Sequence, residues 1–240
     1  MSDRSKFWLL SFITLLAVGL TLSLGRWQLS RAAEKERLQA SVEARGQQDE
    51  LPGAVLLQAG PADLLIHRRI RVRGRWLGAH TVFLDNRPMN ARPGFYVVTP
   101  LQLEGSGQAV LVQRGWVARN FTDRARLPTV DTPPGEVRLS GRIAPPPAKL
   151  YELGQAQAGP IRQNLDLAQF SVQTGVPLLP VSIVQAGEPS EGLLREWPLA
   201  GAGIDRHYGY AFQWFGLSAL LAILYVWFQI VRPIFKRPRI

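Results

Sequence analysis

Cysteine is absent from this 240-residue chain, and histidine occurs only as His67, His80 and His207. The first absence excludes zinc ribbons, iron–sulfur centres and thiol redox chemistry, because all of them need cysteine sulfur. It also fits an oxidising compartment, where an unpaired thiol is a liability. The sequence lacks a His-Glu-x-x-His helix, a Gly-x-Ser-x-Gly elbow and a phosphate-binding Gly-rich loop followed by a helix. We therefore expect that this protein is not an enzyme.

What the chain does have is two long uncharged apolar runs, at residues 7–24 and 211–231. At about 1.5 Å of helix per residue, each run is long enough to cross a hydrocarbon core of about 30 Å. The sequence thus predicts a membrane hairpin of two transmembrane helices that encloses the more polar residues 25–210.

The first run has an alternative interpretation as a cleaved signal peptide, because Ser23-Leu24-Gly25 offers a small-x-small cleavage site. Two observations favour a retained helix. The run is longer than the roughly 7–15 apolar residues of a signal peptide. In addition, Trp27 just beyond it suits an anchor at the membrane interface.

The orientation follows from the positive charges that flank the runs, since Lys and Arg near a span stay on the cytoplasmic side. These charges are Arg4, Lys6, Arg232, Lys236, Arg237 and Arg239. Both termini are therefore expected in the cytoplasm and the central domain in the periplasm. The segment before the first run is too short for a mitochondrial transit peptide. We expect a multi-pass protein of a bacterial inner (plasma) membrane, in contact with the lipid bilayer.

The expected organisation has five parts. They are a cytoplasmic N-terminus (1–6), a first span (7–24), a periplasmic domain (25–210), a second span (211–231) and a basic cytoplasmic tail (232–240). The periplasmic domain is expected to comprise a helical connector (25–45), a β domain (52–186) and a return segment (187–210).

Short segments rich in β-branched, aliphatic and aromatic residues predict the strands of the β domain. They are residues 66–77, 81–85, 94–103, 109–118, 135–144, 161–164 and 178–184. Short turn-rich connections favour sequential pairing, which predicts a mainly antiparallel β (barrel or sandwich-like) α+β domain. One soluble helix is expected at residues 166–173, with Asp166 as its N-cap.

The formal net charge of +10 invites a nucleic-acid interpretation, but its distribution argues against one. Residues 25–210 hold 22 Lys and Arg against 17 Asp and Glu, a net charge of 22 − 17 = +5. In this region Arg69, Arg71, Arg73 and Arg75 alternate with other residues and would share one face of a strand. That face is either simply solvated or a dock for anionic lipid, an acidic partner or ligand carboxylates. No nucleic acid partner is expected.

A histidine stands at the start of the second run, in the segment 205–215. If the helix includes this segment, His207, Ala211 and Trp214 share one face, with the imidazole above a small gap and an aromatic wall. A flat porphyrin fits such a face. The alternative is an ordinary interfacial belt of amphipathic rings. Gln213, an amide inside the apolar run, indicates a hydrogen-bonding partner in the bilayer.

Four segments in order match a known family. They are LGRWQL (24–29) with Arg31, NR (86–87) followed by GFYVVTPL (94–101), VLVQRGWV (110–117) and HYGYAFQWF (207–215). Over nearly its full length the chain resembles the surfeit locus protein 1 family. The resemblance implies a non-enzymatic assembly factor for haem-copper cytochrome c oxidase, with oxidase subunit I and haem A synthase as partners. It also implies transient binding of haem a.

The resemblance further implies that His207 contacts haem a, as a ligand of its iron. Arg206 stands where the family often has asparagine, and it would meet a haem propionate, with Tyr210 and Trp214 beside the ring. The remaining matched residues are expected to have structural or partner-binding roles. They are Gly25, Trp27, Gln28, Asn86, Arg87, Gly94, Arg114, Gly115 and Trp116.

For several of these residues a physical role can be stated. Gly25 and Gly94 would permit close backbone approach, and Gly115 would let the Trp116 indole fold against the barrel. Asn86 and Arg87 follow a strand, so their side chains bond to loop carbonyls or face a partner. Two further functions compete with haem handling. One is a protein scaffold that holds subunit I without binding haem, and the other is a membrane-anchored module for lipids or small molecules.

Overall fold

The computed structural model describes residues 2–58, 62–120, 122, 127–151, 159–198 and 201–236. It divides into a helical unit, Met1–Ala40 with Leu199–Ile240, and a β unit, Ser41–Pro198. Parts of four predicted segments lie outside the described residues: residue 1 of the N-terminus, residues 59–61, 121, 123–126 and 152–158 of the β domain, residues 199–200 of the return segment and residues 237–240 of the basic tail.

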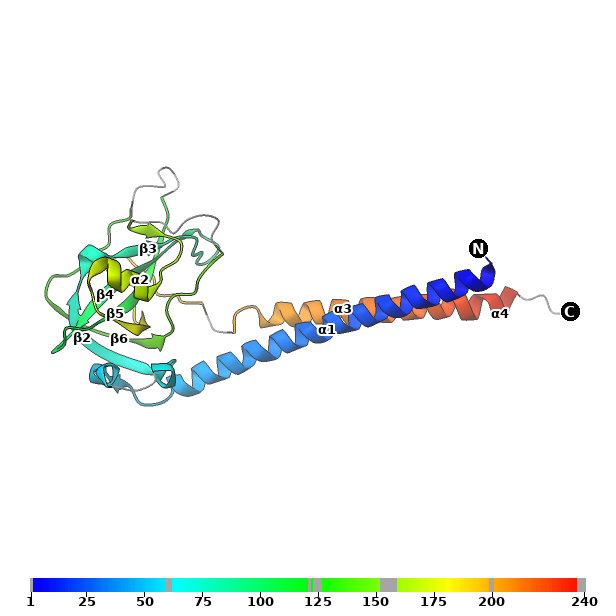
Figure 1. Ribbon diagram of the computed structural model, residues 1–240, viewed down its shortest axis with the longest axis horizontal. Coiled ribbons are helices and arrows are strands. Elements are labelled where there is room, and N and C mark those ends of the chain that lie inside the picture. The colour runs from blue at the N-terminus through cyan, green and yellow to red at the C-terminus, as the bar shows by residue number, and fades with distance from the viewer. Residues whose placement is uncertain are drawn as a thin grey trace. The chain divides into compact units, whose positions relative to one another are not determined.

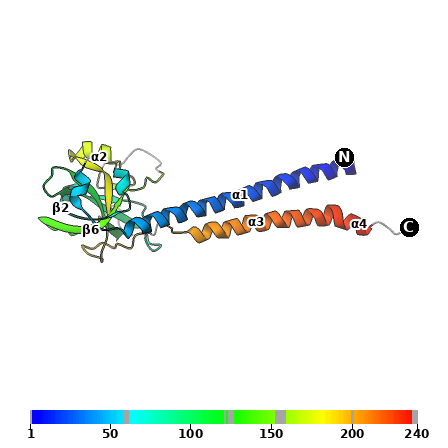
Figure 2. The ribbon, with the colours of Figure 1, turned by 90° about the horizontal axis from the view of Figure 1, so that it is seen from below.

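The helical unit is built from α1 (Asp3–Gly46) and α3 (Ile204–Val226), which lie side by side in both views (Figures 1 and 2). Two helical stretches of the described chain, Arg4–Gly46 and Ile204–Phe235, are long and apolar enough to cross a membrane. They agree with the predicted hairpin and narrow the expected multi-pass protein to two spans. The stretch predicted as a helical connector is confirmed as helix, because α1 continues through it without a break.

The two helices pack through residues spaced alternately by three and four. On α1 the partly or fully buried residues in this register are Ser11, Thr14, Val18, Thr21, Gly25, Gln28, Ala32, Lys35 and Gln39. On α3 they are Ile204, His207, Ala211, Trp214, Ser218, Leu221 and Tyr225. We call these residues the helix seam. The alternation is the spacing of a coiled-coil seam, and the small residues in it allow the close approach typical of membrane helices.

The second span ends in the π-helical turn η4 (Trp227–Val231) and the short helix α4 (Arg232–Lys236). Pro233 accounts for the change. Its ring clashes with the carbonyl group four residues earlier, that of Gln229, and it has no N–H to donate. The Arg232 N–H instead bonds to the Trp227 carbonyl, five residues back, as in other π-bulges.

The β unit contains one eight-stranded sheet. Its strands are β1 (Leu51–Pro52), β2 (Arg69–Trp76), β3 (Val82–Leu84), β4 (Gly94–Leu103), β5 (Ala109–Ala118), β6 (Glu136–Ala144), β7 (Ile161–Arg162) and β8 (Leu178–Gln185). The order is β1-β2-β6-β8-β5-β4-β3-β7, and β2 also pairs with β4. This last pairing closes a ring of β2, β6, β8, β5 and β4, which makes the domain a small barrel.

The seven predicted strands are confirmed in position, but two expectations about their pairing were wrong. The sheet is mixed rather than mainly antiparallel, because the pairs β1–β2, β3–β7 and β5–β8 are parallel. Sequential pairing holds for β3–β4 and β4–β5 but not for β5 and β6, which both pair with β8. A parallel pair needs a long crossover. Here the connection from β5 to β8 includes β6, β7 and α2 (Leu167–Thr174).

Buried aliphatic side chains from β2, β4, β5, β6 and β8 fill the interior of the ring. The 3₁₀ helix η1 (Gly53–Leu57) adds Leu56 to this core, and two more 3₁₀ turns, η2 (Ala62–Leu65) and η3 (Gly78–His80), flank β2. The predicted helix at 166–173 is confirmed as α2. The carboxylate of Asp166 caps it by accepting bonds from the N–H groups of Ala168 and Gln169, which satisfies donors that the first turn leaves free.

Candidate functional site

The candidate site of the helical unit is a hydrogen bond between its two helices, beside the apolar runs. Nδ1 of His207 on α3 lies 2.8 Å from Oε1 of Gln28 on α1. The amide oxygen can only accept, so Nδ1 carries a hydrogen, and in the neutral imidazole Nε2 then keeps its lone pair. Nε2 has no hydrogen-bond partner among the described residues. A histidine whose tautomer is fixed by a bond at one nitrogen, with the other nitrogen free, is arranged as a metal ligand usually is.

Polar contacts continue from this bond away from the apolar runs. The Tyr208 hydroxyl donates to Glu36 at 2.7 Å, and the Lys35 ammonium group donates to the Ala202 carbonyl at 3.1 Å. Within the runs, the hydroxyl groups of Ser11 and Tyr225 lie 2.5 Å apart. The seam is thus held by polar bonds at both ends, where the hydrophobic effect adds little between lipid-embedded helices.

The geometry corrects one expectation about the face of His207. Ala211 and Trp214 do share that face, but Ala211 is only 2% exposed, in the seam with α1. The small gap is therefore filled by the neighbouring helix and does not hold a porphyrin. A flat ligand at Nε2 would have to lie beside the seam instead.

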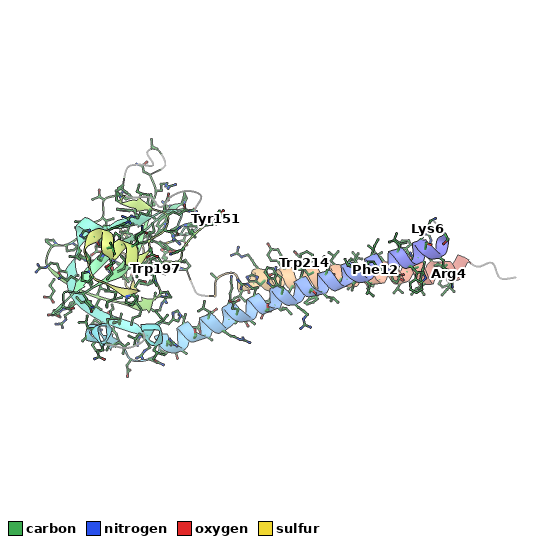
Figure 3. The ribbon with its side chains drawn as sticks, in the orientation of Figure 1. Arg4, Lys6, Phe12, Tyr151, Trp197 and Trp214 are labelled. Atoms are coloured by element: carbon green, nitrogen blue, oxygen red, sulfur yellow. The ribbon has the colours of Figure 1, made fainter. Side chains whose placement is uncertain are left out.

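The other predicted haem contacts are distributed around α3. Arg206 and Tyr210 are exposed, four residues apart on a face next to the seam, whereas Trp214 is half-buried in the seam. Figure 3 labels Trp214 on the helix pair. The amide of Gln213 is exposed and makes no hydrogen bond to any described residue. The hydrogen-bonding partner that the sequence predicted for it in the bilayer is therefore not found in the described part of this chain. Trp27 is 54% exposed, as expected for an interfacial anchor.

Gly25 provides a close approach between α1 and α3. A β-carbon on Gly25 would lie 2.7 Å from Cε1 of the Phe215 ring, so only glycine leaves room for that ring against α1. The expected role of Gly25 in close approach thus has a definite partner, an aromatic side chain of the second span.

In the β unit, the matched residues form one structural cluster around Trp116. Its indole lies over Gly94, where a β-carbon would come within 2.4 Å of the ring, and Nε1 donates to the Arg87 carbonyl at 2.7 Å. The Arg87 guanidinium donates to the Ala148 carbonyl at 2.6 Å, and burial lowers the pKa of Arg87. Arg87 therefore binds loop carbonyls inside the unit. Asn86 has a φ of 58°, in the left-handed region that asparagine tolerates.

Arg114 and Gly115 fasten the return segment to β5. The Arg114 guanidinium is fully buried, 2.8 Å from the Glu191 carboxylate and 4.6 Å above the Trp76 ring. A β-carbon on Gly115 would lie 2.7 Å from the side chain of Leu193. Gly115 thus makes room for the return segment, whereas Gly94 makes room for the Trp116 indole, a role that the sequence had suggested for Gly115.

Three Asp, Glu or His side chains able to hold a metal ion together do not occur anywhere in the described part of the chain. Any metal at His207 would thus have to bring most of its own ligands, as a haem iron does. The four motifs agree with the comparison of this chain with known families, in which the SURF1 family model matches residues 15–219. The chain belongs to the SURF1 family.

Relatives of this SURF1 family member come from bacteria and from eukaryotes. A SURF1-like protein of Rickettsia conorii is 28% identical over 224 residues, which cover 90% of this chain and 89% of the relative. Human Surfeit locus protein 1 is 28% identical over 255 residues, covering 95% and 78%. The yeast Cytochrome oxidase assembly protein SHY1 is 25% identical over 139 residues, covering 57% and 36%.

Sequence reasoning missed two features of this SURF1 family member. The first is the contact of Gln28 with His207, although a signal existed: Gln28 follows its apolar run by four residues and His207 precedes its own by four. In a helical hairpin these positions lie at similar depth. The second is the pair Glu191 and Arg195 in the return segment, where Arg195 donates to the Arg114 carbonyl at 2.9 Å. No local pattern marks these two residues, because their partners lie far away in sequence.

Proposed function

We propose that this protein assists the assembly of cytochrome oxidase by holding haem a at His207 until oxidase subunit I receives it, with haem A synthase as the donor. In this proposal both termini are cytoplasmic and the β unit is periplasmic, in a bacterial inner membrane. Membership of the SURF1 family and the printed name of the yeast relative, a cytochrome oxidase assembly protein, support the assembly role.

The observation that carries the haem proposal is the bond from His207 to Gln28. Bound haem a would supply an iron centre that accepts a neutral imidazole nitrogen, together with two propionate groups. The chain fits this chemistry, because Gln28 fixes the tautomer and orientation of His207 and leaves Nε2 as an acceptor. The exposed guanidinium of Arg206, in the adjacent position of α3, is free to bind a carboxylate in a bidentate manner.

Each of these residues has a distinct part in the proposal. Gln28 positions the imidazole, His207 supplies the ligand atom and Arg206 neutralises a propionate. Tyr210, with a half-exposed ring, and Trp214 would border the macrocycle on α3. Transient holding suits a site on the side of a helix pair, since a ligand there can leave without unfolding the protein.

A second candidate function is a scaffold that binds subunit I without haem. One observation favours the scaffold. The matched residues of the β unit are buried and bond within that unit, so they do not form a ligand site: Arg87, Arg114 and Trp116. The third candidate, a lipid-binding module, has less support. It would need space inside the barrel, and apolar side chains fill that interior.

The test is a reduced-minus-oxidised absorbance spectrum of membranes from cells that lack the gene and carry a plasmid copy. The wild-type copy should restore the haem a band, whereas His207→Ala should not. His80→Ala is the matched control, because this histidine lies in the β unit. A band of wild-type height with His207→Ala would reject the haem role and favour the scaffold. An intact band in cells without any copy would reject the assembly role itself.

A further inference from the structure

Six arginines gather on the outer face of two neighbouring strands, β2 and β6. On β2 the side chains alternate strictly between exposed and buried along the strand, which places four arginines outside. The antiparallel register with β6 then sets Arg69 opposite Arg142 and Arg73 opposite Arg138. We call these residues the arginine face: Arg69, Arg71, Arg73, Arg75, Arg138 and Arg142.

Like charges directly opposite each other destabilise a sheet. The arginine face therefore lowers the stability of the β unit, which suggests that it is kept for a function other than folding. The charges are also poorly neutralised within the chain. Arg71 pairs with the Glu50 carboxylate at 2.6 Å, and it is the one member with a carboxylate partner among the described residues. The side chains of three members make no hydrogen bond or ion pair with any described residue: Arg73, Arg75 and Arg138.

Besides Glu50, two more acidic residues lie near the face, at its Arg75 end. Glu136 stands opposite Arg75 in the register, and Glu104 borders the pockets beside Arg73 and Arg75. The opposed pairs Arg69–Arg142 and Arg73–Arg138, on either side of the Arg71–Glu50 pair, have no carboxylate partner among the described residues.

The shape of the face indicates what it can bind. β2 is hydrogen-bonded to β1, β6 and β4, so a partner cannot join it as another strand and must be recognised by the side chains. Alternate residues on a strand are about 6.6–6.8 Å apart, which is also the repeat of alternate side chains in an extended peptide. Beside the row lies a pocket of about 340 Å³, lined by Leu57, Ala54 and Pro52 and bordered by Arg71 and Arg73.

We propose that the arginine face binds an acidic segment of a partner protein, held in an extended conformation along β2. Alternate carboxylates pair with the arginines, and one apolar side chain enters the pocket beside Arg71 and Arg73. Arginine suits this role because its planar guanidinium binds carboxylates in a bidentate manner. The linear two-residue repeat and the apolar pocket favour a polypeptide over lipid headgroups. This surface is independent of His207 and of any haem.

The experiment measures fluorescence anisotropy of two labelled peptides with the full chain in phosphatidylcholine nanodiscs. One peptide alternates Glu and Thr around a central Leu, and the other has the same composition with its Glu residues in one block. The variants are Arg73→Gln/Arg138→Gln and, for charge-matched comparison of single changes, Arg73→Gln and Arg37→Gln. Arg37 is also exposed without a described partner, but it lies on α1.

We expect the alternating peptide to bind more tightly than the block peptide, and salt to weaken both. The double variant should bind the alternating peptide about tenfold more weakly. Arg73→Gln should lose affinity and Arg37→Gln should not. Equal binding by wild type and the double variant would overturn the proposal, as would equal binding of the two peptides. If the double variant loses flotation with phosphatidylglycerol vesicles but keeps peptide affinity, the face binds lipid and the proposal is wrong.

Discussion

The indole ring of Trp116 occupies the volume that a β-carbon on Gly94 would need. The ring atoms Cε2 and Cζ2 lie 2.4 Å from that position, and the Val117 carbonyl oxygen lies equally close. The contact joins β4 to β5, and the indole N–H continues it to the Arg87 carbonyl. The absence of a side chain at Gly94 thus allows the Trp116 indole to link β4, β5 and the turn that contains Arg87.

Substituting Gly94→Ala should destabilise the β unit by about 2–3 kcal/mol, because neither the ring nor the backbone oxygen can move without breaking other contacts. Urea unfolding followed by tryptophan fluorescence measures the loss. The matched control is Gly107→Ala in the turn between β4 and β5, where a β-carbon meets nothing within 4 Å. An equal effect of the two substitutions would contradict this account of Gly94.

Gly25→Ala should weaken the helix pair, since its methyl group would collide with the Phe215 ring. We expect the free energy of association of the two helices to weaken by about 1–3 kcal/mol, and by less if the Phe215 ring adopts another rotamer. Spin labels on cysteines introduced at the exposed Leu22 and Leu217 would report a broader distance distribution in nanodiscs. Gly19→Ala, in the same apolar run with nothing near its β-carbon, should leave the distribution unchanged.

Glu191→Gln should cost about 3 kcal/mol of stability, because it leaves the buried Arg114 guanidinium without its carboxylate partner. Glu50→Gln removes the exposed pair with Arg71 and should cost less than about 1 kcal/mol. Chemical unfolding of both variants under identical conditions compares them. Similar losses would show that burial does not govern the contribution of the Glu191 pair.

The stability of the β unit should fall on acidification, and His67 should be one cause. Burial and the neighbouring charges of Arg142 and Arg45 hold the pKa of His67 below its ordinary value of 6.5. The folded protein therefore binds fewer protons than the unfolded chain, so the contribution is present above pH 6.5 and is lost progressively below it.

Thermal unfolding across this pH range checks the prediction. His67→Asn should flatten the decline, since asparagine tolerates the left-handed φ of 73° at this position and does not titrate. His80→Asn should keep the wild-type decline. If the stability of the His67→Asn variant fell with pH as steeply as that of the wild type, His67 would not be a cause of the decline.

Gln28→Leu should reduce haem affinity about tenfold if His207 is the ligand, because the imidazole loses the bond that sets its tautomer. Absorbance titration of the full chain in nanodiscs with haem measures it. Gln213→Leu changes an exposed amide on α3 that makes no bond to α1, so its affinity should equal that of the wild type. Equal haem affinities of the wild type, Gln28→Leu and Gln213→Leu would show that Gln28 has no part in haem binding.

The strands and helices of this protein could be predicted because their signals are local. The alternation along β2, the apolar length of both spans and the capping carboxylate of Asp166 each lie within one segment. The parallel pair of β5 and β8 could not be predicted, since it depends on the packing of everything between them. The same reason explains why β1, a strand of two residues, escaped notice.

The candidate site was predicted in part. His207 was found because a histidine beside an apolar run is conspicuous, but its open face was inferred from α3 alone. Only the position of α1 shows that Ala211 is covered and that Gln28 is the partner. Which of two helix faces is covered depends on a second segment, and one helical pattern does not contain that information.

The hydrogen bond of Ser11 with Tyr225 joins residues 214 positions apart, which bears on how the chain is made. At roughly 5–20 residues per second, the ribosome needs about 10–40 s to reach the second partner. During that interval the first span waits in the bilayer without the second. It can do so because Ser11 and Thr21 each donate to a carbonyl of their own helix, those of Phe7 and Ala17. The hydroxyl groups of the nascent span thus have backbone partners before the second span is synthesised, and they keep them afterwards.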